Sequence, residues 1–187
     1  MKNTPDNFSC NTLDETRAFL KKHDFSIAQS ISIEQARTLS QWIVDENKQG
    51  SCMVEKCPNT LYQAACEHGC IAISQHGVMV GFMGLYRFAD MYEAGTLIVD
   101  PAFRKLWVWR VLQQSLFHSY QHYNIFLVTY FDTVMRIANK THLVALARDK
   151  INSTMLGIIE SGGKLLSDDA AYGDKWLLLN RNFHETI

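Results

Sequence analysis

A group of cysteine and histidine side chains in the first half of the chain offers the donor atoms that zinc prefers. Its members are Cys57, Cys66, His68 and Cys70. Structural zinc sites usually contain a pair of cysteines separated by two residues, and this group contains no such pair. We therefore interpret the thiols as buried free cysteines and expect no metal.

A second segment could bind an anion. The apolar residues 97–99 are followed by Asp100, a good N-cap, and by Pro101, which fits the first turn of a helix. This pattern predicts a strand that leads directly into a long helix over about residues 101–121. The first turn of such a helix presents unpaired backbone N–H groups and the positive end of the helix dipole, which together favour a phosphate.

These candidate residues require an alternating pattern of helices and strands. Capping boxes at Thr12–Glu15 and Ser32–Gln35 predict two helices, and glycine-containing turns separate short apolar runs. Helices are expected at 13–22, from 33 to about 49, at 59–68, 101–121 and 152–161. Strands are expected at 25–31, 70–74, 78–87, 93–99, 142–147 and 176–180. The apolar segment 124–139 is ambiguous, and its spacing weakly favours a helix.

Composition restricts the class of protein. The chain has 187 residues, of which 47% are hydrophobic and 20% charged, with a formal net charge of −1. This length suits one domain over residues 1–187, and the charge is far from the basic balance of nucleic-acid-binding proteins. No apolar run approaches the ~20 residues of a membrane helix, and the polar start lacks a secretory signal. An odd number of cysteines, five, then favours the reducing cytoplasm.

The segment 97–112 resembles the cofactor-binding motif of the GCN5-related N-acetyltransferases (GNAT superfamily). The family pattern is V-x-P-x-x-R-x-x-G-x-G/A, and Val99, Pro101 and Arg104 match it in place. A later family motif, an Asn followed by a helix that ends in Gly, is similar to Asn152 through Gly163. The resemblance covers about residues 70–182 and implies an α/β (α+β) fold with a mixed, mostly antiparallel central sheet flanked by helices.

The same resemblance implies that the chain binds acetyl-CoA or another acyl-CoA and transfers the acyl group to an amine by direct attack. Implied cofactor-binding residues are Ile98, Val99, Arg104, Lys105, Trp107, Val108, Trp109, Arg110 and Asn152. The family splays two neighbouring strands, expected here at 93–99 and about 142–148, so that the pantetheine can pair with strand backbone between them. A backbone N–H near Val99 would polarise the thioester carbonyl.

The implied catalytic base is Glu93, at the start of the strand that precedes the motif. Its position is similar to that of a frequent glutamate base in the family. The alternative is a solvated glutamate without a catalytic role. Asp90 and Tyr92 are weaker candidates for the base, and His142 is more readily explained as a hydrogen-bonded structural residue.

Two departures from the family pattern stand against this function. Trp107 and Trp109 occupy the positions of the two motif glycines, and Ile159 replaces a Tyr that often protonates the leaving thiolate. On a continuous helix the two tryptophans would point in nearly opposite directions, with Trp109 in the core and Trp107 over the phosphate site. Either the loop tilts and CoA still binds, or the chain is a degenerate ligand-sensing or protein-interaction module.

The acceptor stays open at this point. A small-molecule amine or a protein amine fits equally well, and neither nucleic acid nor membrane is expected as a partner. Family members commonly dimerise, so the resemblance implies a possible homodimer. The segment 122–141 exceeds the minimal connection of the family, and nothing in its sequence assigns it a role.

Overall fold

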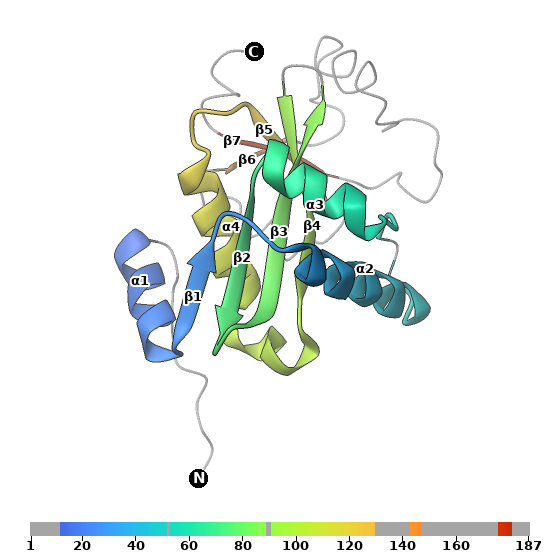
Figure 1. Cartoon of the computed structure of the whole chain (residues 1–187). Coiled ribbons are helices and arrows are strands. Elements are labelled where there is room, and N and C mark those ends of the chain that lie inside the picture. The colour runs from blue at the N-terminus through green and yellow to red at the C-terminus, as the bar shows by residue number, and fades with distance from the viewer. Residues whose placement is uncertain (1–11, 52, 89–90, 130–142, 147–175, 181–187) are drawn as a thin grey trace.

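A single mixed sheet organises the part of the chain that the computed structural model describes, which is residues 12–51, 53–88, 91–129, 143–146 and 176–180. Seven strands follow the order β1-β2-β3-β4-β5-β7-β6 (Figure 1). All neighbouring strands are antiparallel except β4 and β5, which run parallel. The expected mixed and mostly antiparallel sheet is therefore confirmed.

The strands are β1 (Phe25–Ala28), β2 (Cys70–Gln75), β3 (Val78–Phe88), β4 (Met91–Val99), β5 (Ile125–Thr129), β6 (Leu143–Leu146) and β7 (Trp176–Asn180). The helices are α1 (Leu13–Lys22), α2 (Ile33–Lys48), α3 (Pro58–Glu67) and α4 (Val108–Ser119), with a 3₁₀ turn, η1 (Pro101–Leu106), before α4. Both expected capping boxes are present, at Thr12 and at Ser32, because each side chain and its partner at N3 satisfy backbone N–H groups reciprocally.

Helices cover both faces of the sheet. In the view of Figure 1, α3 lies in front of the sheet, α2 starts in front of it near β4 and extends to the right, and α4 lies behind β2 and β3. One buried cluster joins α1 and α4 to one face and includes Phe19, Leu112 and Ile71. A second cluster joins α2 and α3 to the other face and includes Leu39, Leu61 and Phe82. The sheet thus separates two apolar layers, and its strand ends are left to build a site.

Two expectations about segments are wrong. The residues 101–121 form no continuous helix, because Trp107 adopts a left-handed conformation (φ 62°) between η1 and α4. The segment 124–139 begins as strand β5 rather than as a helix, which agrees with its run of β-branched and aromatic residues from Ile125 to Thr129. The predicted helix at 152–161 lies outside the described residues.

The neighbour of β4 is also different from the expected one. β5 pairs with β4, whereas the strand expected near 142–148 is β6, which pairs with β7. The position of β6 agrees with the strand that the sequence predicts, but local sequence does not encode which strands become neighbours in a sheet.

Candidate functional site

The parallel strands β4 and β5 stay together over a short distance only. They pair at Tyr92 with Ile125 and at Glu93 with Phe126, and the Tyr92 N–H donates to the Asn124 carbonyl at 2.9 Å. β4 continues to Val99. Within the part of the chain that the structure describes, residues 94, 95, 98 and 99 pair with β3 on one side, and no residue of 94–99 pairs with a strand on the other. This edge of β4 can therefore offer backbone donors and acceptors to a ligand.

A β-bulge interrupts β4 along the same stretch. Gly95 pairs with Gly84 and Ile98 pairs with Phe82, so Thr96 and Leu97 both lie opposite the single residue Met83. Thr96 has φ 51°, in the left-handed region that β-branched residues rarely occupy. A bulge leaves one residue without a ladder partner and bends the strand, and it is a common device beside active sites.

Glu93 lies two residues before Gly95, where β4 and β5 separate. It pairs with Tyr86 of β3 and is partly buried. A Cβ atom added to Gly95 would lie 3.7 Å from the Glu93 carboxyl carbon and 3.4 Å from the Tyr86 ring. The predicted base thus lies beside the bulge and not on an open surface. Of the other candidates, Tyr92 is partly buried in β4 and pairs with Ile125, whereas Asp90 and His142 lie outside the described residues.

Three residues that the sequence did not single out, Lys56, Tyr86 and Thr96, meet at the bulge. The Tyr86 hydroxyl shares a hydrogen bond with Thr96 Oγ1 at 2.6 Å. Lys56 Nζ donates to the same oxygen at 3.5 Å and lies 4.5 Å from the centre of the Tyr86 ring. These residues come from the α2–α3 connection, β3 and β4, and only a prediction of strand register could have brought them together.

Burial raises the pKa of the Tyr86 phenol well above its ordinary value, and the negative charge of Glu93 acts in the same direction. The hydrogen bond to Thr96 opposes this shift. Tyr86 is therefore a neutral phenol at any physiological pH. Beside it, Lys56 and Glu93 bring charges of opposite sign to the same short stretch of β4.

The turn that follows β4 is tightly fixed. Asp100 Oδ1 accepts a hydrogen bond from the Ala102 N–H at 2.8 Å, so Asp100 is an N-cap as predicted. The element that it caps is η1 and not a long helix. Arg104 Nε donates to the Val99 carbonyl at 3.1 Å, and the guanidinium forms an ion pair with Glu46 of α2. The motif arginine thus connects the turn to β4 and α2.

Trp107 is the N-cap of α4, and its side chain makes no capping hydrogen bond. The Trp107 carbonyl accepts from the N–H groups of Arg110 and Val111, which leaves the earlier N–H groups of the first turn for an external acceptor. The Trp107 side chain is 40% exposed, and its ring centre lies 6.0 Å from that of Trp109. The two rings therefore lie close together, contrary to the expectation of nearly opposite directions.

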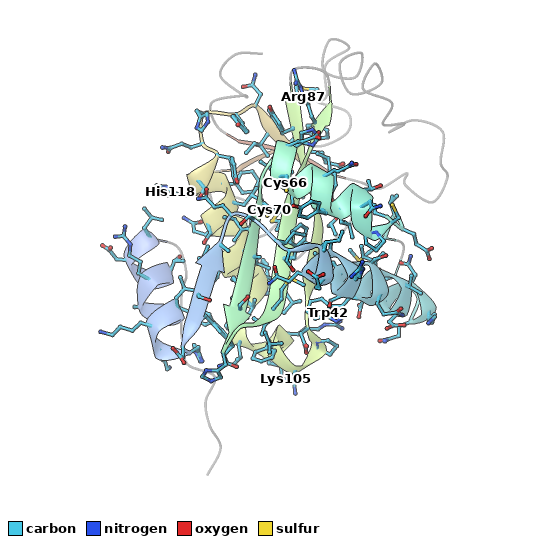
Figure 2. The ribbon with its side chains drawn as sticks, viewed as in Figure 1. Trp42, Cys66, Cys70, Arg87, Lys105 and His118 are labelled. Atoms are coloured by element: carbon cyan, nitrogen blue, oxygen red, sulfur yellow. The ribbon has the colours of Figure 1, made fainter. Side chains whose placement is uncertain are left out.

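The other predicted cofactor-binding residues fall into two groups. The side chains of Ile98, Val99, Val108 and Arg110 are buried, and Trp109 packs against the core as expected. These five could contribute backbone groups to a ligand more readily than side chains. Lys105 is exposed on η1, at the end of the sheet opposite to Arg87 (Figure 2). Asn152 and Ile159 lie outside the described residues.

The described residues contain no group of three or more His, Cys, Asp or Glu side chains that could hold a metal. Cys57 and Cys66 are exposed, and Cys70 is buried at the start of β2 (Figure 2). Of these three described cysteines, only Cys70 therefore fits the expectation of buried thiols. Among the same residues, no helix is both long and apolar enough to span a membrane.

Comparison with known proteins shows the fold. No family model and no curated protein sequence matches this chain. The structure is similar to Rv2747 from Mycobacterium tuberculosis, solved in complex with CoA, with a TM-score of 0.61, 17% identity, and coverage of 83% of this chain and 98% of that one. An acetyltransferase of the GNAT family from Staphylococcus aureus Mu50 has a TM-score of 0.57 at the same identity, covering 83% of this chain and 98% of that one.

A third similar structure is N-acetylglutamate synthase from Neisseria gonorrhoeae, complexed with coenzyme A and N-acetyl-glutamate. Its TM-score is 0.59 at 17% identity, over 83% of this chain. This chain spans only 34% of that enzyme. At these identities the similarity concerns the fold, and it confirms the fold that the segment 97–112 implied.

Proposed function

From the GCN5-related N-acetyltransferase fold of this chain, we propose that it transfers an acyl group, most simply acetyl, from acyl-CoA to an amine. The observation that carries this proposal is the separation of β4 and β5 beyond Glu93. The edge of β4 that this separation exposes can pair with the two amides of a pantetheine arm, as a further strand would.

The turn after β4 suits the phosphates of the same ligand. The N-terminus of α4, where the Trp107 side chain makes no cap, offers backbone N–H groups and a positive dipole end to an anion. Trp107 replaces a glycine of the motif, but its backbone adopts the left-handed conformation that glycine favours. Position 107 therefore has a backbone conformation that glycine would adopt readily, and the substitution changes the side chain there.

Glu93 would accept the proton of the attacking amine, directly or through one water molecule. The amine nitrogen attacks the thioester carbonyl carbon, and backbone N–H groups of the β4 bulge stabilise the charge that develops on the carbonyl oxygen. The C–S bond then breaks and the CoA thiolate leaves. A thiol is a much stronger acid than an alcohol, as the pKa of about 8.5 of a cysteine side chain illustrates, so the CoA thiolate can leave without the tyrosine that Ile159 replaces.

The acceptor is an amine of a small molecule or a protein. Its chemistry must suit a site that carries both the Glu93 carboxylate and the Lys56 ammonium beside the bulge. An amino acid bears both complementary charges, so amino acids form the first group of acceptors to assay. The expected cytoplasmic location and homodimer stay predictions.

One observation favours a second candidate function. The exposed Trp107 ring stands at the N-terminus of α4, where a phosphate would approach. If the ring blocks that approach, the chain is a ligand-sensing or protein-interaction module that has lost CoA binding.

Titration with acetyl-CoA by calorimetry, for wild type beside Trp107→Gly, separates the two candidates. The acyltransferase predicts micromolar binding by both proteins and release of CoA thiol in the presence of an accepted amine. The module predicts no binding by wild type and a gain of binding in Trp107→Gly. If neither protein binds, and a saturating addition of CoA raises the melting temperature of neither, the acyltransferase proposal is wrong.

A further inference from the structure

We infer that Tyr86 is a positioning residue of this site: its hydroxyl holds Thr96 in the left-handed conformation that shapes the β4 bulge. This inference rests on the proposed acyltransferase function for its effect on the reaction. Its structural part, the restraint of the bulge by a side chain of the neighbouring strand, can be tested separately.

Thr96 needs a restraint because its conformation is unfavourable. With φ 51°, its Cβ lies too close to the following carbonyl oxygen, and the branch at Cβ adds further contacts. Such a residue persists only where the surrounding structure fixes it. Since the neighbouring glycine, Gly95, would adopt this conformation without cost, the position of the strained residue is not explained by local sequence.

The restraint is the hydrogen bond of 2.6 Å between the Tyr86 hydroxyl and Thr96 Oγ1. Lys56 Nζ, from the connection between α2 and α3, donates to the same oxygen at 3.5 Å. Thr96 Oγ1 is thus held from two directions by residues that lie 10 and 40 positions away in the sequence. Rotation of Thr96 into the ordinary β region would break both contacts.

The ring of Tyr86 is itself well placed to act as an anchor. It lies over the cross-strand pair of Gly84 and Gly95. A Cβ atom added to Gly84 would lie 3.3 Å from the Tyr86 hydroxyl, and one added to Gly95 would lie 3.4 Å from the Tyr86 ring. Two neighbouring glycines therefore provide the space that the ring fills. The raised pKa of the phenol keeps the hydroxyl protonated, so the bond to Thr96 persists at neutral and mildly alkaline pH.

The consequence for the reaction follows from where the bulge lies. It comes directly after the last residues of β4 that pair with β5, so it lines the separation between the two strands. A backbone N–H group that polarises a carbonyl acts only if it is held in position before the substrate arrives. Loss of the Tyr86 hydroxyl should therefore lower kcat more than it raises KM for acyl-CoA.

The test combines Tyr86→Phe, Thr96→Gly and the double variant. Tyr86→Phe keeps the ring and removes the restraint, and we expect kcat to fall about tenfold while KM for acetyl-CoA changes little. Thr96→Gly removes the need for the restraint, because glycine adopts this conformation readily. In the Thr96→Gly background, Tyr86→Phe should then change kcat by less than about twofold. Tyr62→Phe, which removes an exposed hydroxyl of α3, is the matched control.

Amide hydrogen exchange of the segment 94–99 tests the inference without turnover. Exchange should become faster in Tyr86→Phe, stay at the wild-type rate in Tyr62→Phe, and show no added effect of Tyr86→Phe once Thr96 is Gly. Unchanged exchange in Tyr86→Phe overturns the inference. So does an equal loss of kcat in both backgrounds, which would assign Tyr86 a direct role. If wild type turns over no amine while exchange behaves as expected, the acyltransferase proposal fails and the restraint stands.

Discussion

The indole rings of Trp107 and Trp109 lie with their centres 6.0 Å apart, although two residues separated by this spacing would point apart on a helix. The reason is the left-handed conformation of Trp107, which ends η1 and begins α4. Trp109 belongs to the helix and packs against the core, whereas Trp107 remains exposed. The two residues that replace the motif glycines thus have different roles.

This conformation of Trp107 predicts an inverted preference between Gly and Ala. In an ordinary helix Ala is the more stabilising residue by about 1 kcal/mol. At position 107 we expect Trp107→Gly to be more stable than Trp107→Ala by about 1 kcal/mol, because only Ala suffers the left-handed strain. Urea unfolding of both variants measures the difference. The same pair of substitutions at Lys48, in the last turn of α2, should show the ordinary order, and an ordinary order at position 107 would contradict the assigned conformation.

The proposed role of Glu93 predicts a selective loss of catalysis. Glu93→Gln retains the size and hydrogen-bonding capacity of the side chain but removes the base. We expect kcat to fall by about 100-fold or more, with the affinity for acetyl-CoA unchanged. Steady-state assays with an accepted amine, together with calorimetry, separate the two quantities. Glu67→Gln, at an exposed position of α3, is the control, and a similar loss there would show that the effect is one of net charge.

The contact between Gly69 and Tyr120 predicts a large effect of a single methyl group. A Cβ atom at Gly69 would lie 2.5 Å from the Tyr120 ring, whose hydroxyl also accepts from the Cys70 N–H. Gly69→Ala should therefore lower the free energy of unfolding by about 3 kcal/mol. Gly77 is the matched control, because its φ is also positive but open space surrounds it. Gly77→Ala should cost only about 1 kcal/mol of left-handed strain in the same urea titrations, and equal losses would exclude the clash.

Cys70 predicts a fall of stability at alkaline pH. Burial raises the pKa of its thiol to about 12, whereas the thiol of an unfolded cysteine has a pKa of about 8.5. Between these values the folded protein retains a proton that the unfolded chain loses. The contribution of Cys70 is therefore complete below pH 8.5 and is lost as the pH rises toward 12.

Urea unfolding between pH 8 and 10 checks this dependence. Cys70→Ala should flatten the decrease, by about 1 to 2 kcal/mol over that interval. Cys57→Ala should not flatten it, because that thiol is exposed and its hydrogen bond with Thr60 lowers its pKa, a shift opposite in sign to that of Cys70. In the folded protein, a thiol reagent should modify Cys57 and spare Cys70. Rapid modification of Cys70 without unfolding would contradict its burial.

Local features of the sequence determined much of the fold. The capping boxes at Thr12 and Ser32 fix the beginnings of α1 and α2, because each hydrogen bond joins residues three positions apart. The turn at residues 75–77 similarly determines the hairpin of β2 and β3. The motif from Val99 to Arg104 identified the fold, and it placed Glu93 on the strand that leads into the turn.

Only the tertiary structure decided which strands become neighbours and which side chains meet at the site. That β5 lies beside β4, and that Tyr86, Lys56 and Thr96 meet at the bulge, depends on strand register over 10 to 40 residues. Local propensity carries no information on pairing at this separation, because the free energy comes from burial and hydrogen bonds that exist only in the assembled sheet. The left-handed conformation of Trp107 also depends on the tertiary structure, because a tryptophan adopts that conformation only where the surrounding turn requires it.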